Sequence, residues 1–217
     1  MTIRNASSMP PQPDDWQARG YHGQGNVRDL IGTLAGRSVM ICGNGGGVFE
    51  EYEAAAAALT DPLVFACNDV GQYLPIVHHW VSLHTDNLAA WKAVRALHCR
   101  SMVPTKYHGV DPRPHVDYMW DRLTPCFALS GYFAMQIAWI MGAERIVLCG
   151  CPGIQTRRFF EAKAREDFGY GEPMPRGDHG IRNQLQSEME RVPGFKLAVR
   201  SMSGWTQSYF GPIETIL

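Results

Sequence analysis

Residues 38–59 read SVMICGNGGGVFEEYEAAAAAL and divide into three parts. Residues 38–42 form a short apolar run of the kind that makes a buried strand. Residues 43–47 contain four glycines and end that run, and residues 48–59 follow with two early glutamates and five consecutive alanines. Because alanine favours helices and acidic groups favour a helix N-terminus, the stretch predicts a strand, a glycine turn and a helix.

Apolar runs and helix-like segments alternate along the rest of the chain. Further strands are expected at residues 63–67, 79–83, 145–150 and 196–202, and further helices at 88–98, 130–141 (capped near Ser130 or Thr124) and 181–191. Residues 104–125, rich in proline, histidine and aromatic side chains, are expected to form a long irregular excursion over one edge of the sheet. The fold class we predict is α/β, a Rossmann-like three-layer sandwich with a mostly parallel sheet.

Composition fits one domain with an N-terminal arm. Of 217 residues, 45% are hydrophobic and 19% charged, which is enough apolar material for a sizeable core. Residues 1–36 are expected to be the arm and residues 37–217 the nucleotide-binding domain. The polar, proline-bearing start carries no signal-like or membrane-spanning run, so we expect a cytoplasmic protein that makes no membrane contact.

Charge and cysteine content narrow the function classes. The formal net charge is −1 without a basic run, which argues against a dedicated duplex-binding protein, although nucleic acid as an acceptor stays open. Six scattered cysteines favour a reducing compartment. The one close pair, Cys149 and Cys151, lacks a second pair at zinc-finger spacing, so no metal site is predicted there.

Polar residues follow several predicted strands, at the edge where open parallel sheets bind ligands. Gly43, Asn44, Gly45 and Gly46 follow the first strand, and Asn68 with Asp69 follows the second. Glycines let backbone amides approach a phosphate closely, so we expect a nucleotide there. The turn meets neither the dinucleotide fingerprint nor the phosphate-loop motif, so a ligand-free tight turn stays open. An alternative in which Asp69 binds the ribose of a nucleotide, as in NAD enzymes, also stays open.

Three blocks of sequence resemble one known family. Residues 39–45, residues 64–68, and Ser130-Gly131 followed by residues 138–150 are similar in order and spacing to the bacterial sialyltransferases. They are equally similar to motility-accessory-factor glycosyltransferases and to 6-hydroxymethylpterin diphosphokinases, and residues 201–211 resemble small phage-encoded relatives. The resemblance implies a Rossmann-like fold that binds a cytidine or other nucleotide through Asn44, Asn68, Ser130 and Gly131. The chain has Cys151-Pro152 where the family usually has an aspartate, and none of its tyrosines is a secure match for those that assist the departing phosphate in the family.

Candidate catalytic residues are two histidines and two arginines. His179, at the position where sialyltransferases carry a basic histidine, is the first candidate for the general base, and His84 is the second. Arg157 and Arg158 are candidates to neutralise a leaving phosphate. Each has a plainer interpretation, namely an exposed loop histidine or a solvated charge pair. Metal ligation by His84 with Asp86 is less favoured, because no third ligand is evident.

The function predicted from these residues is a glycosyltransferase that uses a CMP-type nucleotide-sugar donor and acts by direct displacement on an unknown acceptor. One alternative is an ATP-dependent pyrophosphokinase acting on a small heterocycle, which would need Mg²⁺ held by acidic groups such as Asp69 or Asp86. Another is a non-catalytic, phage-type nucleotide-binding or interaction protein. Homo-oligomerisation is left open.

Overall fold

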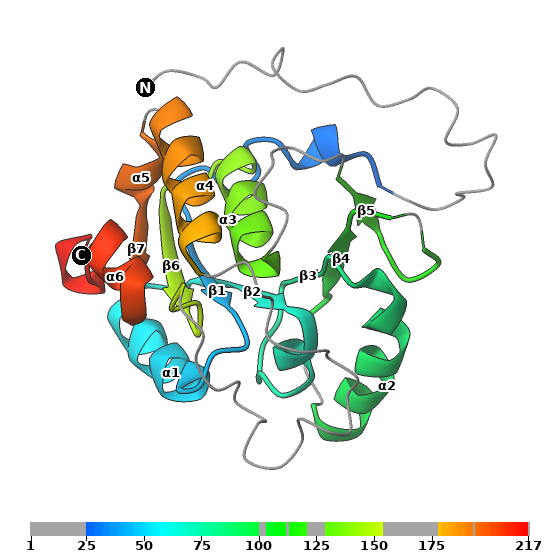
Figure 1. Cartoon of the computed structure of the whole chain (residues 1–217). Helices are drawn as coiled ribbons and strands as arrows, with labels where there is room; N and C mark the ends of the chain where they lie inside the picture. Colours follow the sequence, from blue (N-terminus) through cyan, green and yellow to red (C-terminus); the bar gives the residue numbers. More distant parts are fainter. Residues whose placement is uncertain are drawn as a thin grey trace.

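A computed structural model of the chain describes residues 25–99, 103–111, 113–120, 129–153, 178–192 and 194–216. Within these ranges seven strands form one parallel sheet in the order β5-β4-β3-β2-β1-β6-β7 (Figure 1). They are β1 (Ser38–Cys42), β2 (Leu63–Cys67), β3 (His79–Val81), β4 (Lys106–Gly109), β5 (Tyr118–Met119), β6 (Arg145–Cys149) and β7 (Val199–Ser201). The predicted Rossmann-like α/β architecture is confirmed.

The strand order reverses beside β1. The chain runs from β1 outward to β5, then crosses back to β6 and β7 on the other side. Three strands end at one level there, since Cys42 is the Cα partner of Ala66 in β2 and of Cys149 in β6. Ligands of open parallel sheets bind beyond the carboxyl ends of the strands at such a reversal. The turns after β1, β2 and β6 therefore define the edge of the sheet at which a ligand is expected.

Helices cover both faces of this sheet, giving three layers (Figure 1). One face carries η3 (Val27–Leu30), α3 (Ser130–Ile140) and α4 (Asp178–Arg191), and the other carries α1 (Val48–Ala58), η4 (Asn68–Gln72) and α2 (Leu88–His98). The remaining short helices are η5 (Thr85–Asn87), α5 (Phe195–Ala198), α6 (Gly204–Phe210) and η6 (Ile213–Thr215).

The continuous apolar sequence of β1 follows from this double cover. All five of its residues are buried. Ile41 packs in the cluster on the α3 face, while Met40 and Cys42 pack in the cluster beneath α1. A strand buried on both faces cannot alternate apolar and polar residues, so it reads as an unbroken run.

Part of the predicted N-terminal arm packs on the sheet. Val27, Leu30 and Leu34 are buried in the cluster beside α3. The Leu34 amide donates to the carbonyl oxygen of Met141 at 2.8 Å. The boundary between an arm and the domain at residues 36 and 37 stays a prediction.

Two local predictions were wrong. Residues 196–198, expected in a strand, belong to the helical turn α5, because Phe195 and Ala198 are buried three residues apart while Leu197 is 76% exposed. The segment 104–125, expected to be irregular, contributes β4 and β5 within its described part. Ser130, expected near the cap of its helix, is the first helical residue and follows the N-cap residue Leu129, which makes no side-chain cap. Thr124, the other residue expected there, lies outside the described residues.

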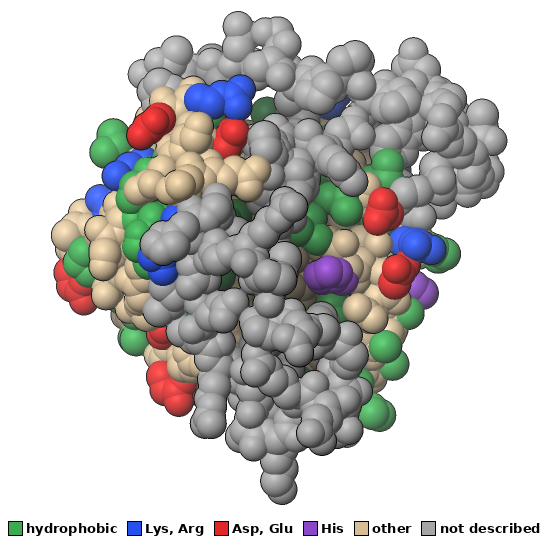
Figure 2. Space-filling view, in the orientation of Figure 1, with side chains coloured by type: hydrophobic (Ala, Val, Ile, Leu, Met, Phe, Trp, Pro, Cys, Tyr) green, Lys and Arg blue, Asp and Glu red, His purple; other side chains and the backbone are tan. Residues whose placement is uncertain are grey.

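No helix within the described ranges combines the length and the apolar character needed to cross a membrane. On the face that Figure 2 shows, the described acidic and basic side chains are intermixed around the margin, without a large patch of one sign.

Candidate functional site

Asn68 connects the ends of three structural elements. It follows β2 with a φ of +56°, a left-handed conformation that asparagine tolerates better than most residues. Its Oδ1 accepts from Ser82 Oγ after β3 and from Ser130 Oγ at the start of α3, each at 2.9 Å. Its carbonyl oxygen accepts from Trp80 Nε1 at 2.6 Å. The side-chain oxygen is therefore fixed, and Asn68 Nδ2 donates to no residue that the structure describes.

Two further bonds fix the serines themselves. Ser130 Oγ accepts from the Leu83 amide at 3.3 Å, and Ser82 Oγ accepts from the His84 amide at 2.8 Å. Both serines are buried. A hydroxyl that accepts from one partner and donates to another has little rotational freedom, so the orientation of the Asn68 amide is set by the fold before any ligand binds.

Asn44 has a structural role, because its side chain is hydrogen-bonded within the protein. Its Nδ2 donates to Asp69 Oδ1, and its Oδ1 accepts from the Val70 amide at 3.3 Å. Both polar atoms of the Asn44 side chain are thus occupied by the residues after β2. Asp69 is 9% exposed, and this bond satisfies one of its carboxylate oxygens. The pair joins the turn after β1 to the turn after β2.

The glycine turn packs tightly against the loop after β6. The Gly43 amide donates to Cys149 O, and the Gly45 amide donates to Gly150 O, both at 2.8 Å. A Cβ on Gly43 would lie 2.6 Å from Gly150 O and 2.5 Å from Cys151 Sγ. Gly43 and Gly45 are therefore required by backbone packing, and their amides are used within the protein.

The first turn of α1 also carries a carboxylate that is already bound. Glu51 Oε2 accepts from the Gly150 amide at 2.7 Å. Gly47 precedes the helix with a φ of +85° and provides no side-chain cap. The loop after β6 is thus held from two sides, by the glycine turn and by Glu51.

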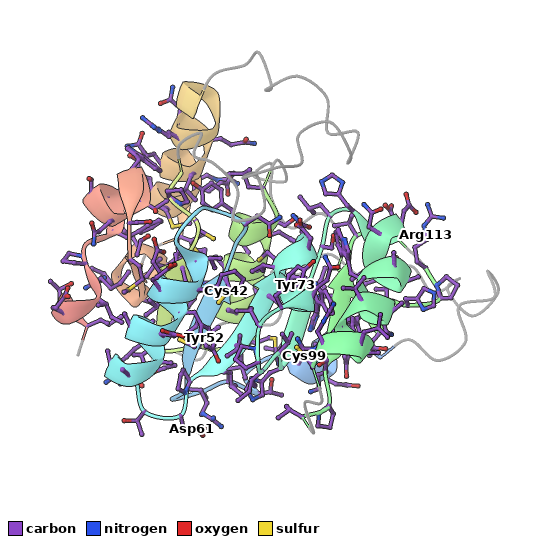
Figure 3. The ribbon with its side chains drawn as sticks, turned by 90° about the horizontal axis from the view of Figure 1, so that it is seen from below. Cys42, Tyr52, Asp61, Tyr73, Cys99 and Arg113 are labelled. Atoms are coloured by element: carbon purple, nitrogen blue, oxygen red, sulfur yellow. The ribbon has the colours of Figure 1, made fainter. Side chains whose placement is uncertain are left out.

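Thiols lie directly beneath these turns. Figure 3 shows Cys42 of β1 near α1, the helix that carries Tyr52. A hydrogen bond with Cys42 and burial raise the pKa of Cys149, and burial raises the pKa of Cys67 and of Cys151. Burial, with Cys42 and Cys149 nearby, raises the pKa of Tyr52. Thiols held neutral are poor nucleophiles and poor metal ligands, so we give these cysteines a packing role.

His84 and Asp86 do not form a metal site in this structure. His84 is exposed at the carboxyl edge, and Asp86 Oδ1 is paired with Arg113 at 2.7 Å. Figure 3 shows Arg113 on the side of the molecule formed by α2, away from Cys42 in the central strand. Within the described ranges no group of three or more His, Cys, Asp or Glu side chains could hold a metal ion.

The remaining predicted residues are placed only in part. His179 belongs to the first turn of α4 rather than to the loop before it. Arg182, one turn later, donates through Nε to Gly153 O at 3.1 Å and lies over the Trp205 ring, 5.3 Å from its centroid. The start of α4 is therefore attached to the loop after β6. Arg157 and Arg158 lie outside the described residues.

Of the other predicted residues, Ser130 and Gly131 lie at this edge. A Cβ on Gly131 would lie 2.9 Å from Cys151 Sγ, so Gly131 lets α3 approach the loop after β6. Gly46 is exposed in the glycine turn. Ser82 and Arg182 were missed by sequence analysis; the only signal for Ser82 was its position at the end of a predicted strand.

The fold places the chain in a class, the α/β proteins with a Rossmann-like parallel sheet. Within that class the chain shares its fold with the sialyltransferase CstII from Campylobacter jejuni, solved in complex with a substrate analogue, CMP-3FNeuAc. The two are 14% identical, the match covers 80% of this chain and 84% of that one, and the TM-score is 0.55. No family model and no curated protein matches the sequence.

Proposed function

We propose that this chain is a nucleotide-sugar transferase that binds a CMP-type donor at the carboxyl edge of β1, β2 and β3. The observation that carries the proposal is the Asn68 amide, whose oxygen is held by Ser82 and Ser130 while Nδ2 has no partner among the described residues. An oriented donor at a strand-order reversal is suited to an acceptor atom of a nucleotide. The fold shared with a protein solved with a CMP-sugar analogue supports the same ligand class.

The proposed reaction is a direct displacement at the sugar carbon bonded to phosphate. His179 removes the proton from an acceptor hydroxyl, the new carbon–oxygen bond forms, and the bond to the phosphate oxygen breaks. CMP leaves with that electron pair, and Arg157 and Arg158 neutralise its charge. The attachment of α4 to Gly153 through Arg182 supports this role, because it brings the helix that carries His179 to the loop after β6.

The binding step is tested with Asn68→Asp. Aspartate keeps an oxygen for the two serine hydroxyls but replaces the Nδ2 donor with a second acceptor. We expect the affinity for CMP, measured by calorimetry, to fall by about tenfold to a hundredfold, as for a lost buried hydrogen bond. Asn87→Asp is the matched control, since Asn87 is exposed at the start of α2 and makes no side-chain cap. Equal CMP affinity in Asn68→Asp and wild type would show that Asn68 is not the ligand's partner.

The catalytic step is tested by measuring the rate at which the purified protein releases CMP from CMP-sialic acid. His179→Ala should keep CMP affinity while the rate falls by about 10² to 10⁴, the usual share of general acid–base catalysis. A variant as fast as wild type would make His84 the better candidate. A wild-type protein that binds CMP and never releases it from a donor would support the non-catalytic alternative.

A further inference from the structure

We propose that Glu51 limits the phosphate content of the ligand, so that this site accepts a nucleoside monophosphate or its sugar ester and rejects the di- and triphosphates. The inference rests on the proposed nucleotide site and deepens it. In phosphate-binding turns, free backbone amides at a helix N-terminus face the anion. Here the corresponding space already contains a carboxylate from the protein itself.

Glu51 is held in that position by the loop after β6. Its Oε2 accepts from the Gly150 amide at 2.7 Å, and Oε1 is 3.8 Å from the point where a Cβ on Gly47 would lie. Gly47 is the N-cap residue just before α1, so the carboxylate is near the positive end of this helix. A fixed negative charge there offsets the partial positive charge that would otherwise attract a phosphate.

Several backbone amides of the turn are already used within the protein. The amides of Gly43 and Gly45 donate to Cys149 O and Gly150 O, and the Val48 amide donates to Gly45 O at 3.3 Å. Three donors of the turn are therefore satisfied within the protein. A chain of two or three phosphates would have to be held by side-chain cations instead.

The turns at this edge are themselves acidic, although Arg113 pairs with Asp86 and Arg182 donates to Gly153 O from other elements. Residues 43–51, 67–70, 82–86 and 150–153 contain four carboxylate residues and neither lysine nor arginine. On the β2 side of the turn, Asp69 is nearly buried and bonded to Asn44. Glu51 and Asp69 thus lie on opposite sides of the glycine turn, toward β6 and β2 respectively.

These carboxylates repel a ligand more strongly the more negative charge it carries. Cytidine is neutral, the diester phosphate of a CMP-sugar carries one negative charge, the phosphate of CMP carries about 1.5 to 2 near pH 7, and a triphosphate carries more. A unit charge within about 8 Å changes the affinity of a multiply charged ligand by about tenfold at the effective dielectric of a protein surface. The ligand that this edge suits has a neutral nucleoside and a single phosphate, which disfavours the ATP-dependent alternative.

The test compares binding of cytidine, CMP, CDP and CTP, measured by calorimetry without divalent metal, in wild type and in Glu51→Gln. Glutamine retains an oxygen for the Gly150 amide and removes the charge. Wild type should bind CMP more tightly than CTP, and Glu51→Gln should reduce this preference by about tenfold. Glu50→Gln is the matched control, because Glu50 is in the same helical turn but exposed, and it should leave the preference near that of wild type.

A second measurement does not depend on any variant. Raising the salt concentration of the wild-type protein to about 0.5 M should narrow the difference between CMP and CTP, since screening weakens the repulsion. CTP that binds as tightly as CMP, or a preference unchanged in Glu51→Gln, overturns this inference while the proposed function stands. Absence of binding by every cytidine nucleotide overturns the proposed function, and this inference with it.

Discussion

Two side-chain hydrogen-bond networks join neighbouring strands in this protein, and they differ in where they end. In the interior, His79 Nδ1 on β3 and His108 Nε2 on β4 are 2.8 Å apart. At the carboxyl edge, Asn68 accepts from Ser82 and Ser130. The first network is enclosed by the core, whereas the second leaves the Asn68 Nδ2 donor without a partner among the described residues. The difference separates polar groups that stabilise the fold from polar groups available to a ligand.

The interior network has one consistent proton arrangement. Trp120 Nε1, which can only donate, lies 3.0 Å from His108 Nδ1. His108 therefore carries its proton on Nε2 and donates it to His79 Nδ1. Both imidazoles are neutral, and His79 also stacks on Phe65 with ring centroids 4.3 Å apart. Neutral, hydrogen-bonded rings can be buried without the cost of a charge.

The largest effect we expect comes from breaking this interior network. His108→Ala removes a fully buried ring and leaves Trp120 Nε1 and His79 Nδ1 without their partner. The free energy of unfolding should fall by about 3–5 kcal/mol, from the cavity and the unpaired polar atoms together. Urea titration followed by circular dichroism measures it. His84→Ala, at an exposed histidine, should change it by less than about 0.5 kcal/mol. A loss below about 1 kcal/mol for His108→Ala would show that the network contributes little to the fold.

The next effect is a dependence of stability on pH. Burial, with the charge of Lys106 nearby, lowers the pKa of His79 from 6.5 to about 3, and burial lowers the pKa of His108 well below its usual value. Below pH 6.5 the unfolded chain binds protons that the folded chain does not. Stability is therefore complete above about pH 6.5 and falls as the pH decreases toward 3. The slope is about 1.4 kcal/mol per pH unit for each histidine.

Urea midpoints at pH 7, 6 and 5 measure this slope in a range where most carboxylates stay ionised. The His84→Ala variant serves again as the control and should keep the wild-type slope. A free energy of unfolding that stays constant from pH 7 to pH 5 would contradict neutral, buried imidazoles at both positions.

The contrast also explains which parts of the fold could be predicted. β1 is an unbroken apolar run, and α1 contains five consecutive alanines. In both segments the hydrophobic pattern and the secondary-structure propensity therefore indicate the same element. His108 and Trp120 lie among prolines and charged residues, where histidine usually indicates a loop. Their burial depends on pairing with β3, a contact that becomes visible only when the strands are assembled.

The residues of the candidate site were named from the sequence, but their arrangement was not. The resemblance to the sialyltransferases named Asn68 and Ser130 together, and the structure joins their side chains by a hydrogen bond. No local pattern distinguishes Asn44, whose amide is occupied within the protein, from Asn68, whose Nδ2 has no partner in the part of the chain that the structure describes. The glycines after β1 suggested close approach by a phosphate, yet at Gly43 the close neighbours are the carbonyl oxygen of Gly150 and the thiol of Cys151.

The smallest effect we expect concerns the two serines of the edge network. Ser82→Ala removes one of the two hydroxyls that hold the oxygen of Asn68, so the amide gains rotational freedom. CMP affinity, measured by calorimetry, should fall by about twofold to tenfold, the net value of one neutral hydrogen bond. Ser82→Thr keeps the hydroxyl and should restore most of that affinity.

A double-mutant cycle with Asn68→Asp then shows whether Ser82 acts through Asn68. If the serine only orients the amide donor, its removal has no further effect on CMP affinity once that donor is gone, so the losses are not additive. Full additivity would mean that Ser82 contributes to binding by another route, for example through the His84 amide that its Oγ accepts from. The orienting role given to the serine would then be wrong, while the distinction between an enclosed network and one that ends at the edge would rest on Asn68 alone.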